Sequence, residues 1–313
     1  MVRKDRFYYG TLILAMFFWG GSWVSADIII EIAPPFTVGF FRFLIASVPF
    51  LILVKATGGS VRRVFSRSNL KLVFLAGLTG VFGYGVLFLF GMRLTTAAQG
   101  AIIAGFNPTS IAIFAHFIHK EKLDRRLQYS GLLLSFAGVV FVIGVQALLD
   151  FQIDYFYGNL IILGAMMTWG LYSSIGKEAM QEISAAELNF GGSLIGSIFF
   201  GIGAITERVW SLPALGDTVF WLNVFFLGLL VTFVSFFLYF ESIQNLGATR
   251  AGGFINLVPV FGTLLSFLVL REPIYWTFIV GLALVVAGIS LINYPLAKDP
   301  QPDASEGTAG ASG

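Results

Sequence analysis

Two Trp-Gly pairs contain the residues whose type and position most strongly suggest ligand binding, Trp19 and Trp169. Both lie near the middle of long apolar runs, too deep for the aromatic belts that mark membrane surfaces. An aromatic face at that depth can stack on an apolar substrate or hold a cation. Three tyrosines would add hydroxyl groups to the same wall: Tyr84, Tyr172 and Tyr239. We therefore predict substrate-binding positions here, with helix packing as the alternative role.

Pro108 and Pro259 occupy the middle of two further apolar runs. Proline removes one backbone hydrogen bond of a helix and bends it, and in a membrane the freed carbonyl needs protein or a wet cavity beside it. The two positions predict a pair of bent helices around a substrate, with Asn107 and Asn256 as polar groups of the wall. Because proline kinks are ordinary in membrane helices, a purely architectural role is the alternative.

Arg42 and Glu241 are charged residues within apolar runs. A charge inside a membrane is costly and suggests a function by default. Arg42 lies near the start of its run, however, so its long side chain could extend to the lipid headgroups, and a structural anchor is the favoured interpretation. Glu241 lies near the end of its run, where it could bind a cation or a proton, or simply meet water at the interface. Both residues are thus candidate coupling or structural charges.

The motifs of common catalytic and metal sites are missing from the sequence. It contains no Cys, so it offers neither disulfides nor thiolate ligands. It also lacks the signatures of zinc proteases, P-loop enzymes and serine hydrolases. We therefore expect no catalytic residue, no metal site and no cofactor. Pairs of buried carboxylates are not evident either, which favours a facilitator or exchanger over an ion-driven pump.

The elements that must position these residues are membrane helices. Hydrophobic residues make up 57% of the 313 residues and charged residues 12%, and the mean hydropathy is +0.86. Soluble domains carry about a quarter charged residues, so the composition predicts an all-α integral membrane protein. A membrane span needs about 20 mostly apolar residues, and roughly ten such runs follow one another: 8–30, 36–54, 70–92, 96–118, 128–148, 158–177, 185–205, 218–241, 249–270 and 275–294.

Lys and Arg residues are concentrated in alternate connections between these predicted spans. The N-terminal segment and the connections around 55–71 and 120–126 are rich in them, whereas the connections in between hold few. Cytoplasmic connections of membrane proteins carry the excess of Lys and Arg. We therefore predict a multi-pass protein of the cell (inner) membrane with both termini in the cytoplasm.

The two halves of the sequence resemble each other. Matching residues recur 150 or 151 positions apart, among them Met16 and Met166, Trp19 and Trp169, Gly77 and Gly228, Phe82 and Phe233, Pro108 and Pro259, and Gly131 and Gly281. We predict a first repeat over 1–148, a second over 149–296 and a disordered tail over 297–313. Because each repeat has five predicted spans, an odd number, the second must enter the membrane in the opposite orientation, as in carriers that hold their substrate near the bilayer midplane.

These features together resemble the drug/metabolite transporter superfamily, in its ten-helix EamA-type branch. The resemblance covers almost the whole chain and rests on an ordered set of motifs: Phe18-Trp19-Gly20, Phe41-Arg42-Phe43-Leu44-Ile45-Ala46, Lys120-Glu121-Lys122-Leu123 and Arg271-Glu272-Pro273-Ile274, with the two proline-containing spans. It implies a carrier, often an exporter of amino acids or related metabolites, with a cavity lined by spans 1, 3, 4, 6, 8 and 9. The superfamily also includes uptake systems, so the resemblance implies no direction of transport.

We therefore expect a transporter that moves a small metabolite, an amino acid or a related amphipathic or cationic solute, by alternating access, as an exporter or facilitator. The alternatives are an uptake carrier for a cation such as a quaternary amine, an intramembrane lipid-modifying enzyme, and a channel or receptor. The expected partners are the small-molecule substrate and the lipid bilayer, without nucleic acid. Gly192 and Gly196 form a GxxxG motif that would pack the bundle or support a homodimer.

Overall fold

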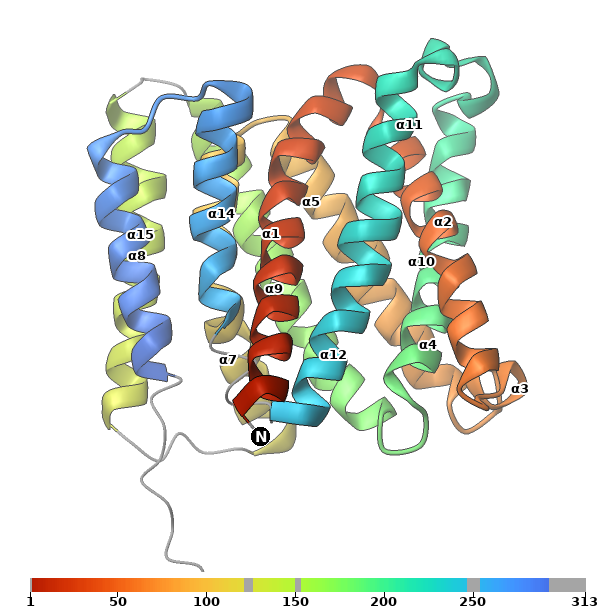
Figure 1. Cartoon of the computed structure of the whole chain (residues 1–313). Coiled ribbons are helices and arrows are strands. Elements are labelled where there is room, and N and C mark those ends of the chain that lie inside the picture. Colours follow the sequence, from red (N-terminus) through yellow and green to blue (C-terminus); the bar gives the residue numbers. More distant parts are fainter. Residues whose placement is uncertain (1, 121–125, 150–152, 247–253, 293–313) are drawn as a thin grey trace, which may run out of the picture.

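The computed structural model describes residues 2–120, 126–149, 153–246 and 254–292, and within these ranges every regular element is a helix (Figure 1). The α-helices, in chain order, are α1 (Val2–Ile32), α2 (Pro35–Ala56), α3 (Val61–Val64), α4 (Leu70–Ala76), α5 (Tyr84–Met92), α6 (Ala97–Ala104), α7 (Asn107–His119), α8 (Arg126–Leu149), α9 (Ile153–Ala179), α10 (Ala185–Thr206), α11 (Thr218–Phe225), α12 (Ser235–Leu246), α14 (Leu257–Leu265) and α15 (Trp276–Ile292). Three π-helical segments, η1 (Gly77–Gly83), η4 (Phe226–Val234) and η6 (Ser266–Leu270), continue some of them. Three 3₁₀ turns complete the set: η2 (Val209–Ser211), η3 (Pro213–Gly216) and η5 (Phe254–Asn256).

Within the described residues, six helical segments are long and apolar enough to cross a membrane: Arg6–Ile32, Pro35–Ala56, Leu70–Met92, Ala97–His119, Ala185–Thr206 and Thr218–Ser242. Shorter apolar helices cover Tyr129–Phe141, Leu257–Leu270 and Trp276–Gly288. Lipid offers no hydrogen-bond partner to the backbone, so a spanning segment must be helical. The predicted all-α membrane fold is therefore confirmed, while the number of ten spans stays a prediction.

Large apolar side chains face outward along these helices. Leu133, Ile198, Ile202 and Leu222 are each more than half exposed. Exposed apolar side chains on several helices suit contact with lipid tails. The outside of the bundle thus agrees with the membrane environment that the composition predicts.

The two halves of the chain repeat unusual backbone features at matched positions. Both η1 and η4 are π-helical and follow a short α-helix at the start of their segments. Lys120 and Arg271 both adopt the left-handed conformation, with φ of 55° and 57°, at the ends of α7 and η6. Most residues other than glycine avoid this region, so its recurrence at matched positions supports the predicted repeats.

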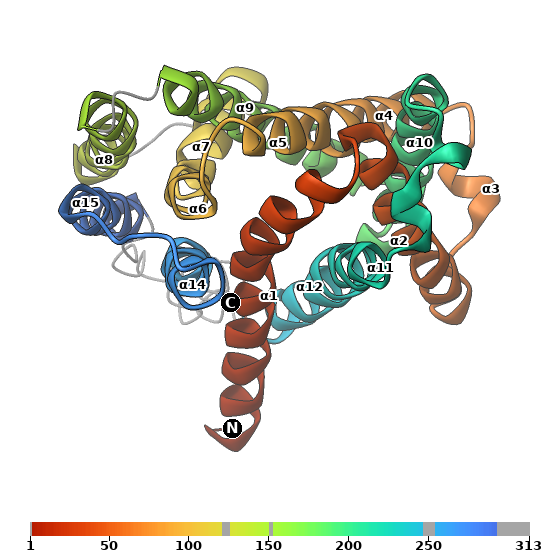
Figure 2. The ribbon, with the colours of Figure 1, turned by 90° about the horizontal axis from the view of Figure 1, so that it is seen from above.

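The packing of the helices is paired in the same way. α1 packs against α14, while its counterpart α9 packs against α7. In Figure 1, α1 runs upward from the N-terminus and α9 runs downward. Seen from above, α8 and α15 pair at one edge of the molecule and α2 and α10 at the other, with α1 between them (Figure 2). This arrangement supports the proposal that the repeats, 1–148 and 149–296, have opposite orientations.

Gly192 and Gly196 lie on the face of α10 that packs against η1. A Cβ atom built on Gly192 would lie 3.8 Å from Gly77 Cα, and one on Gly196 would lie 3.5 Å from Gly77 O. Small residues let helix backbones approach closely in membranes. The motif therefore packs the bundle within one chain, and the homodimer stays an untested expectation.

Candidate functional site

A cavity of about 270 Å³ lies among helices of both halves of the chain. Its wall combines side chains of α1, α2, α5 and α7 from the first half with side chains of α9, α10, α12 and α14 from the second. Ligand pockets typically measure about 300–1,000 Å³ and are mostly apolar with a few polar groups. This cavity therefore has room for a small solute.

Trp19 and Trp169, the two residues of the repeated Trp-Gly pairs, both line this cavity. They contact the same ring, that of Phe236 on α12. The ring centroids lie 5.5 Å apart for Trp19 and 6.0 Å for Trp169. The indole Nε1 of Trp19 also donates to the carbonyl of Val231 at 3.1 Å, which fixes the orientation of its ring. Phe236 thus joins the two indoles into one continuous aromatic wall.

The three predicted tyrosines extend this wall. Tyr239 lies 5.3 Å from Trp19, whereas Tyr84 and Tyr172 lie 5.1 Å and 5.3 Å from Trp169 between ring centroids. All three line the cavity. The structure therefore brings together five aromatic side chains from four helices, α1, α5, α9 and α12, and whether they bind substrate stays a proposal.

Glycines beside the two Trp residues hold the helices close together at this depth. A Cβ atom on Gly20 would lie 2.6 Å from Phe261 Cβ, and one on Gly170 would lie 2.6 Å from the Ser110 backbone carbon. Distances this short leave no room for a side chain, so only glycine fits. Ser110 and Phe261 are themselves matched positions of the two halves. In the two Trp-Gly pairs the glycines therefore allow the close packing of the helices, while the indoles line the cavity.

The helical segment Ala97–His119 is interrupted directly before Pro108, and a gating role for this proline stays a prediction. The segment breaks into α6, which ends at Ala104, and α7, which begins at Asn107. The N–H groups of Gly105 and Phe106 bond carbonyls three residues earlier, at 3.0 and 2.8 Å. Pro108 then lies in the first turn of α7, where no backbone N–H is required. Asn107, Pro108 and Ala104 all line the cavity, so the break itself forms part of the wall.

Pro259 has an equivalent position in the second half. It lies in the first turn of α14, after the 3₁₀ turn η5. It is buried but does not line the cavity, whereas its neighbours Ile255 and Val258 do. Asn256 belongs to η5, and its side chain is not among those that the structure describes. Pro259 therefore lies at the start of α14, next to residues that line the cavity, without lining the cavity itself.

Arg42 lies inside the bundle, so the expectation that it extends to the lipid headgroups is wrong. Its side chain is 7% exposed, lines the cavity and donates through Nε to Thr232 Oγ1 at 3.3 Å. Thr232 lies in π-helical η4 and bonds the carbonyl of Leu227 at 2.8 Å. Because η4 packs so closely on α2 that a Cβ on Gly228 would lie 2.7 Å from Arg42 O, this face of α2 is interior.

Glu241 does not line the aromatic cavity. It lies in a neighbouring pocket of about 210 Å³ together with Phe50 and Thr57. The two pockets share Asn189 and Phe240 in their walls. The structure therefore separates Glu241 from the Trp residues, and a role in ion coupling stays a prediction.

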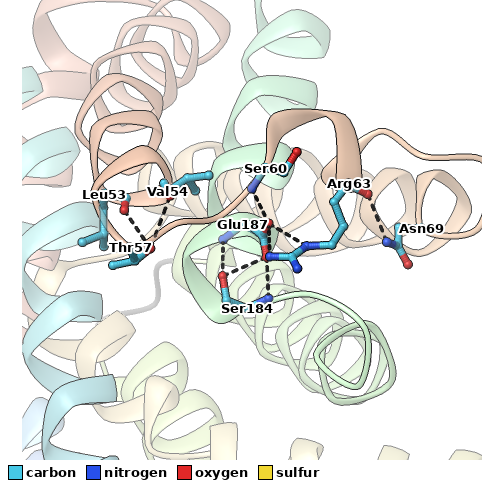
Figure 3. A network of polar contacts seen from close by, with 8 residues as sticks. All are labelled: Leu53, Val54, Thr57, Ser60, Arg63, Asn69, Ser184 and Glu187. Atoms are coloured by element: carbon cyan, nitrogen blue, oxygen red, sulfur yellow. Dashed lines mark hydrogen bonds and ion pairs between the residues drawn. The ribbon is translucent and has the colours of Figure 1, made fainter.

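Glu187 is fully buried and caps a helix (Figure 3). Its Oε2 accepts from the N–H and the hydroxyl of Ser184, at 2.8 and 3.0 Å, at the start of α10. Its Oε1 accepts from the backbone of Ser60 at 2.8 Å and from Arg63 at 3.0 and 2.8 Å. This carboxylate thus ties the connection between α2 and α4 to the start of α10.

Two further carboxylates bind backbone N–H groups of helices remote in sequence. Glu207 accepts from Phe36 and Thr37 in the first turn of α2, at 3.0 and 2.7 Å. Glu272 accepts from the first two residues of α6, at 2.9 and 3.0 Å. The first N–H groups of a helix lack partners within it, and the helix dipole favours a negative charge there. These acids therefore stabilise the fold.

Some residues of the cavity wall were not among the predicted binding residues. Trp23 and Ser173 each lie four positions after a predicted Trp, and Asn189 accepts from Tyr172 Oη at 3.4 Å. Residues four apart share one face of a helix. The spacing of four residues after Trp19 and Trp169 could therefore have predicted Trp23 and Ser173 as wall residues. Nothing in the sequence near Asn189 predicts its place in the wall. Among the described residues, no group of three His, Asp or Glu side chains is placed to hold a metal ion.

Comparisons with known proteins point to one family. The EamA-like transporter family matches residues 6–144 and 156–294. The uncharacterized transporter YetK of Bacillus subtilis is 30% identical, over 97% of this chain and 91% of the relative. An uncharacterized transporter of Archaeoglobus fulgidus is 25% identical over 90% of this chain and 95% of its own. A solved crystal structure shares the fold, with a TM-score of 0.67, 20% identity, and coverage of 92% of this chain and 97% of that one.

Proposed function

The chain belongs to the EamA-like transporter family and is a multi-pass membrane transporter, and we propose that it carries a small metabolite by alternating access around the aromatic cavity. The observation that carries the proposal is that Trp19 and Trp169, matched residues of the two halves, line one cavity. In carriers built from inverted repeats, the substrate site lies at the repeat interface near the bilayer midplane. A substrate held there contacts both halves and is released as they rock against each other.

The form of the cavity supports this mechanism. Its wall extends to Met180 just beyond the end of α9, a residue 41% exposed, so it reaches the side of the bundle that carries the N-terminus (Figure 1). Near the start of α9, Asn159 bonds both Thr95 and Gln99, and all three side chains are buried. These contacts support the proposal that the cavity opens on the side of Met180 and is closed near the start of α9, as one state of an alternating-access cycle requires.

The wall favours an amphipathic solute with an apolar or aromatic body. Indole and phenol faces stack on such groups, while hydroxyl and amide groups of Ser22, Asn107 and Asn189 supply hydrogen bonds. We propose an amino acid or a related metabolite, moved as an exporter or facilitator. The same aromatic faces could also hold a quaternary amine, so uptake of such a cation is the second candidate.

We place the protein in the cell (inner) membrane with both termini in the cytoplasm. The N-terminus and α3 lie at the same end of the molecule in Figure 1. The last turn of α2 and the connection that contains α3 carry the exposed basic residues Lys55, Arg62 and Arg67. An excess of positive charge marks the cytoplasmic side, which supports this orientation.

A ligand screen on the purified protein tests the proposal. A bound ligand raises the unfolding temperature by mass action, so a panel of amino acids, amines and sugars should contain solutes that stabilise the wild type. Trp19→Ala and Trp169→Ala should each lose that stabilisation and the exchange of the same solute in proteoliposomes, because each removes one of the two matched indoles of the wall.

Trp210→Ala is the matched control, since Trp210 is 69% exposed in η2 and lies outside the cavity wall. It should bind and exchange the solute as the wild type does. Normal exchange by both cavity variants would contradict the aromatic site. Absence of any exchanged solute across the panel would contradict the carrier function for these substrate classes.

A further inference from the structure

Arg42 is the only charged residue among the described residues that line the aromatic cavity. It is 7% exposed, and no carboxylate of the described residues forms an ion pair with it. Removing a charge from water without a partner is costly. A ligand of opposite charge that enters the cavity would supply the partner that this buried guanidinium lacks among the described residues.

The contacts of Arg42 leave part of its guanidinium free. Nε donates to Thr232 Oγ1 at 3.3 Å, and the central carbon of the guanidinium lies 4.9 and 5.8 Å from the ring centroids of Phe43 and Phe88. Neither Nη atom forms a hydrogen bond with a described residue. A guanidinium stacks through its face and donates hydrogen bonds along its edge. The two rings therefore contact the centre of the group, while its Nη donors remain available.

The charge is present in only one half of the protein. The positions that match Arg42 in the second half are Gly192 and Ser193, which are neutral. The aromatic wall, in contrast, is built from both halves around Trp19 and Trp169. One end of the substrate thus meets a cation while its body lies against rings.

We infer that Arg42 binds a carboxylate of the substrate, so that the proposed carrier selects small carboxylates or zwitterions with an apolar body. The inference rests on the proposed function. The edge of a guanidinium matches a carboxylate with two parallel hydrogen bonds. One guanidinium balances one negative charge, whereas a phosphate monoester carries about −1.5 to −2 near neutral pH and would leave an unbalanced charge in the cavity. A quaternary amine would be repelled.

Four probes with the same phenyl body separate these classes: L-phenylalanine, 3-phenylpropionate, 2-phenylethylamine and phenyl phosphate. Binding to the purified full-length protein is measured by unfolding temperature and by quenching of Trp fluorescence, since Trp19, Trp23 and Trp169 line the cavity. The wild type should bind the two carboxylates more tightly than the amine and the phosphate. Arg42→Gln should weaken carboxylate binding by about tenfold or more, a difference of about 1.4 kcal/mol, and Arg42→Lys should fall between the two.

Arg93→Gln is the matched control, because it removes the same charge from an exposed residue at the end of α5 and should leave all four affinities unchanged. The inference is overturned if the wild type binds the amine or the phosphate as tightly as the carboxylates. It is overturned as well if the wild type binds none of the carboxylates tested, with benzoate and acetate added to the two above. It is also overturned if Arg42→Gln or Arg42→Lys binds carboxylates as the wild type does.

Failure of the proposed function has a different signature. Binding of a cationic or neutral solute that depends on Trp19 and Trp169 would overturn the carboxylate inference and leave the carrier intact. Carboxylate binding that depends on Arg42, without exchange of any solute, would contradict the carrier function and leave the carboxylate site intact. The wild-type comparison of the four probes needs no variant, so a misfolded Arg42 variant does not prevent a decision.

Discussion

Glu187, Glu207 and Glu272 show how single carboxylates stabilise this membrane protein. Each accepts hydrogen bonds from backbone N–H groups at the start of a helix. In Glu187 the two oxygens together accept from Ser60, Arg63 and Ser184. A buried carboxylate with this many donors needs its negative charge, because a neutral group would leave donors without acceptors. These contacts therefore indicate an architectural role for the three residues.

Replacing Glu187 tests this role. In Glu187→Gln an amide N–H₂ takes the place of one accepting oxygen and faces donors, so we expect the free energy of unfolding to fall by about 1–3 kcal/mol. Thermal unfolding in detergent measures the change. Glu182→Gln, the same substitution at an exposed position just before α10, should leave stability unaltered. Equal stability of the two variants would contradict the capping role.

The segment formed by α6 and α7 shows how an interrupted helix contributes to the site. Gly105 and Phe106 form a tight turn between the two helices, and Pro108 starts the second one. Proline favours the first turn of a helix because its φ is already fixed at a helical value. In membranes, broken helices occur where they border protein or a cavity, and here Asn107 and Pro108 border the cavity. The break therefore presents polar backbone and the Asn107 amide to the site.

Pro108→Ala tests whether this break matters for the conformational cycle. Alanine restores a backbone N–H, so α6 and α7 can join into one helix. We expect solute exchange in proteoliposomes to slow by about tenfold or more, while the dissociation constant changes by less, because the substitution acts on the barrier between states. Pro49→Ala, which alters a proline inside α2 away from the cavity wall, is the control. Wild-type exchange by Pro108→Ala would exclude a gating role for the break.

At the scale of the whole molecule, two matched halves enclose one cavity. The helices that line it come from both halves, whereas α8 and α15, paired at one edge of the molecule, contribute no described residue to its wall (Figure 2). A site shared by two similar halves changes its accessibility when one half rotates against the other, and little energy separates the two arrangements because the halves are alike. The architecture thus favours transport over chemical conversion of a bound ligand.

Single cysteines can test the orientation of this architecture, because the chain contains none of its own. Ser68, between α3 and α4, and Gly216, just before α11, are exposed. The helices α3 and α11 lie toward opposite ends of the molecule (Figure 1). In intact cells a membrane-impermeant maleimide should label Gly216→Cys and leave Ser68→Cys unlabelled until the membrane is opened. Labelling of both, or of Ser68→Cys alone, would contradict cytoplasmic termini.

The sequence by itself determined where the helices lie and which aromatic residues lie deep within them. The predicted spans from 8–30 to 275–294 correspond closely to helices from α1 to α15 in the described residues. Lipid imposes this result, because each spanning segment must satisfy its backbone hydrogen bonds internally. The matches between Trp19 and Trp169 and between Pro108 and Pro259 likewise required only the sequence, since they reflect a repeat.

Only the tertiary structure decided which side of each helix faces the interior. Arg42 extends into the cavity because η4 packs on α2 at that residue, and the packing partner comes from the other half of the chain. Glu207 and Glu272 cap helices remote from them in sequence. The rotation of a helix about its axis depends on contacts with distant segments, and local hydropathy in a chain apolar on nearly every face does not encode it.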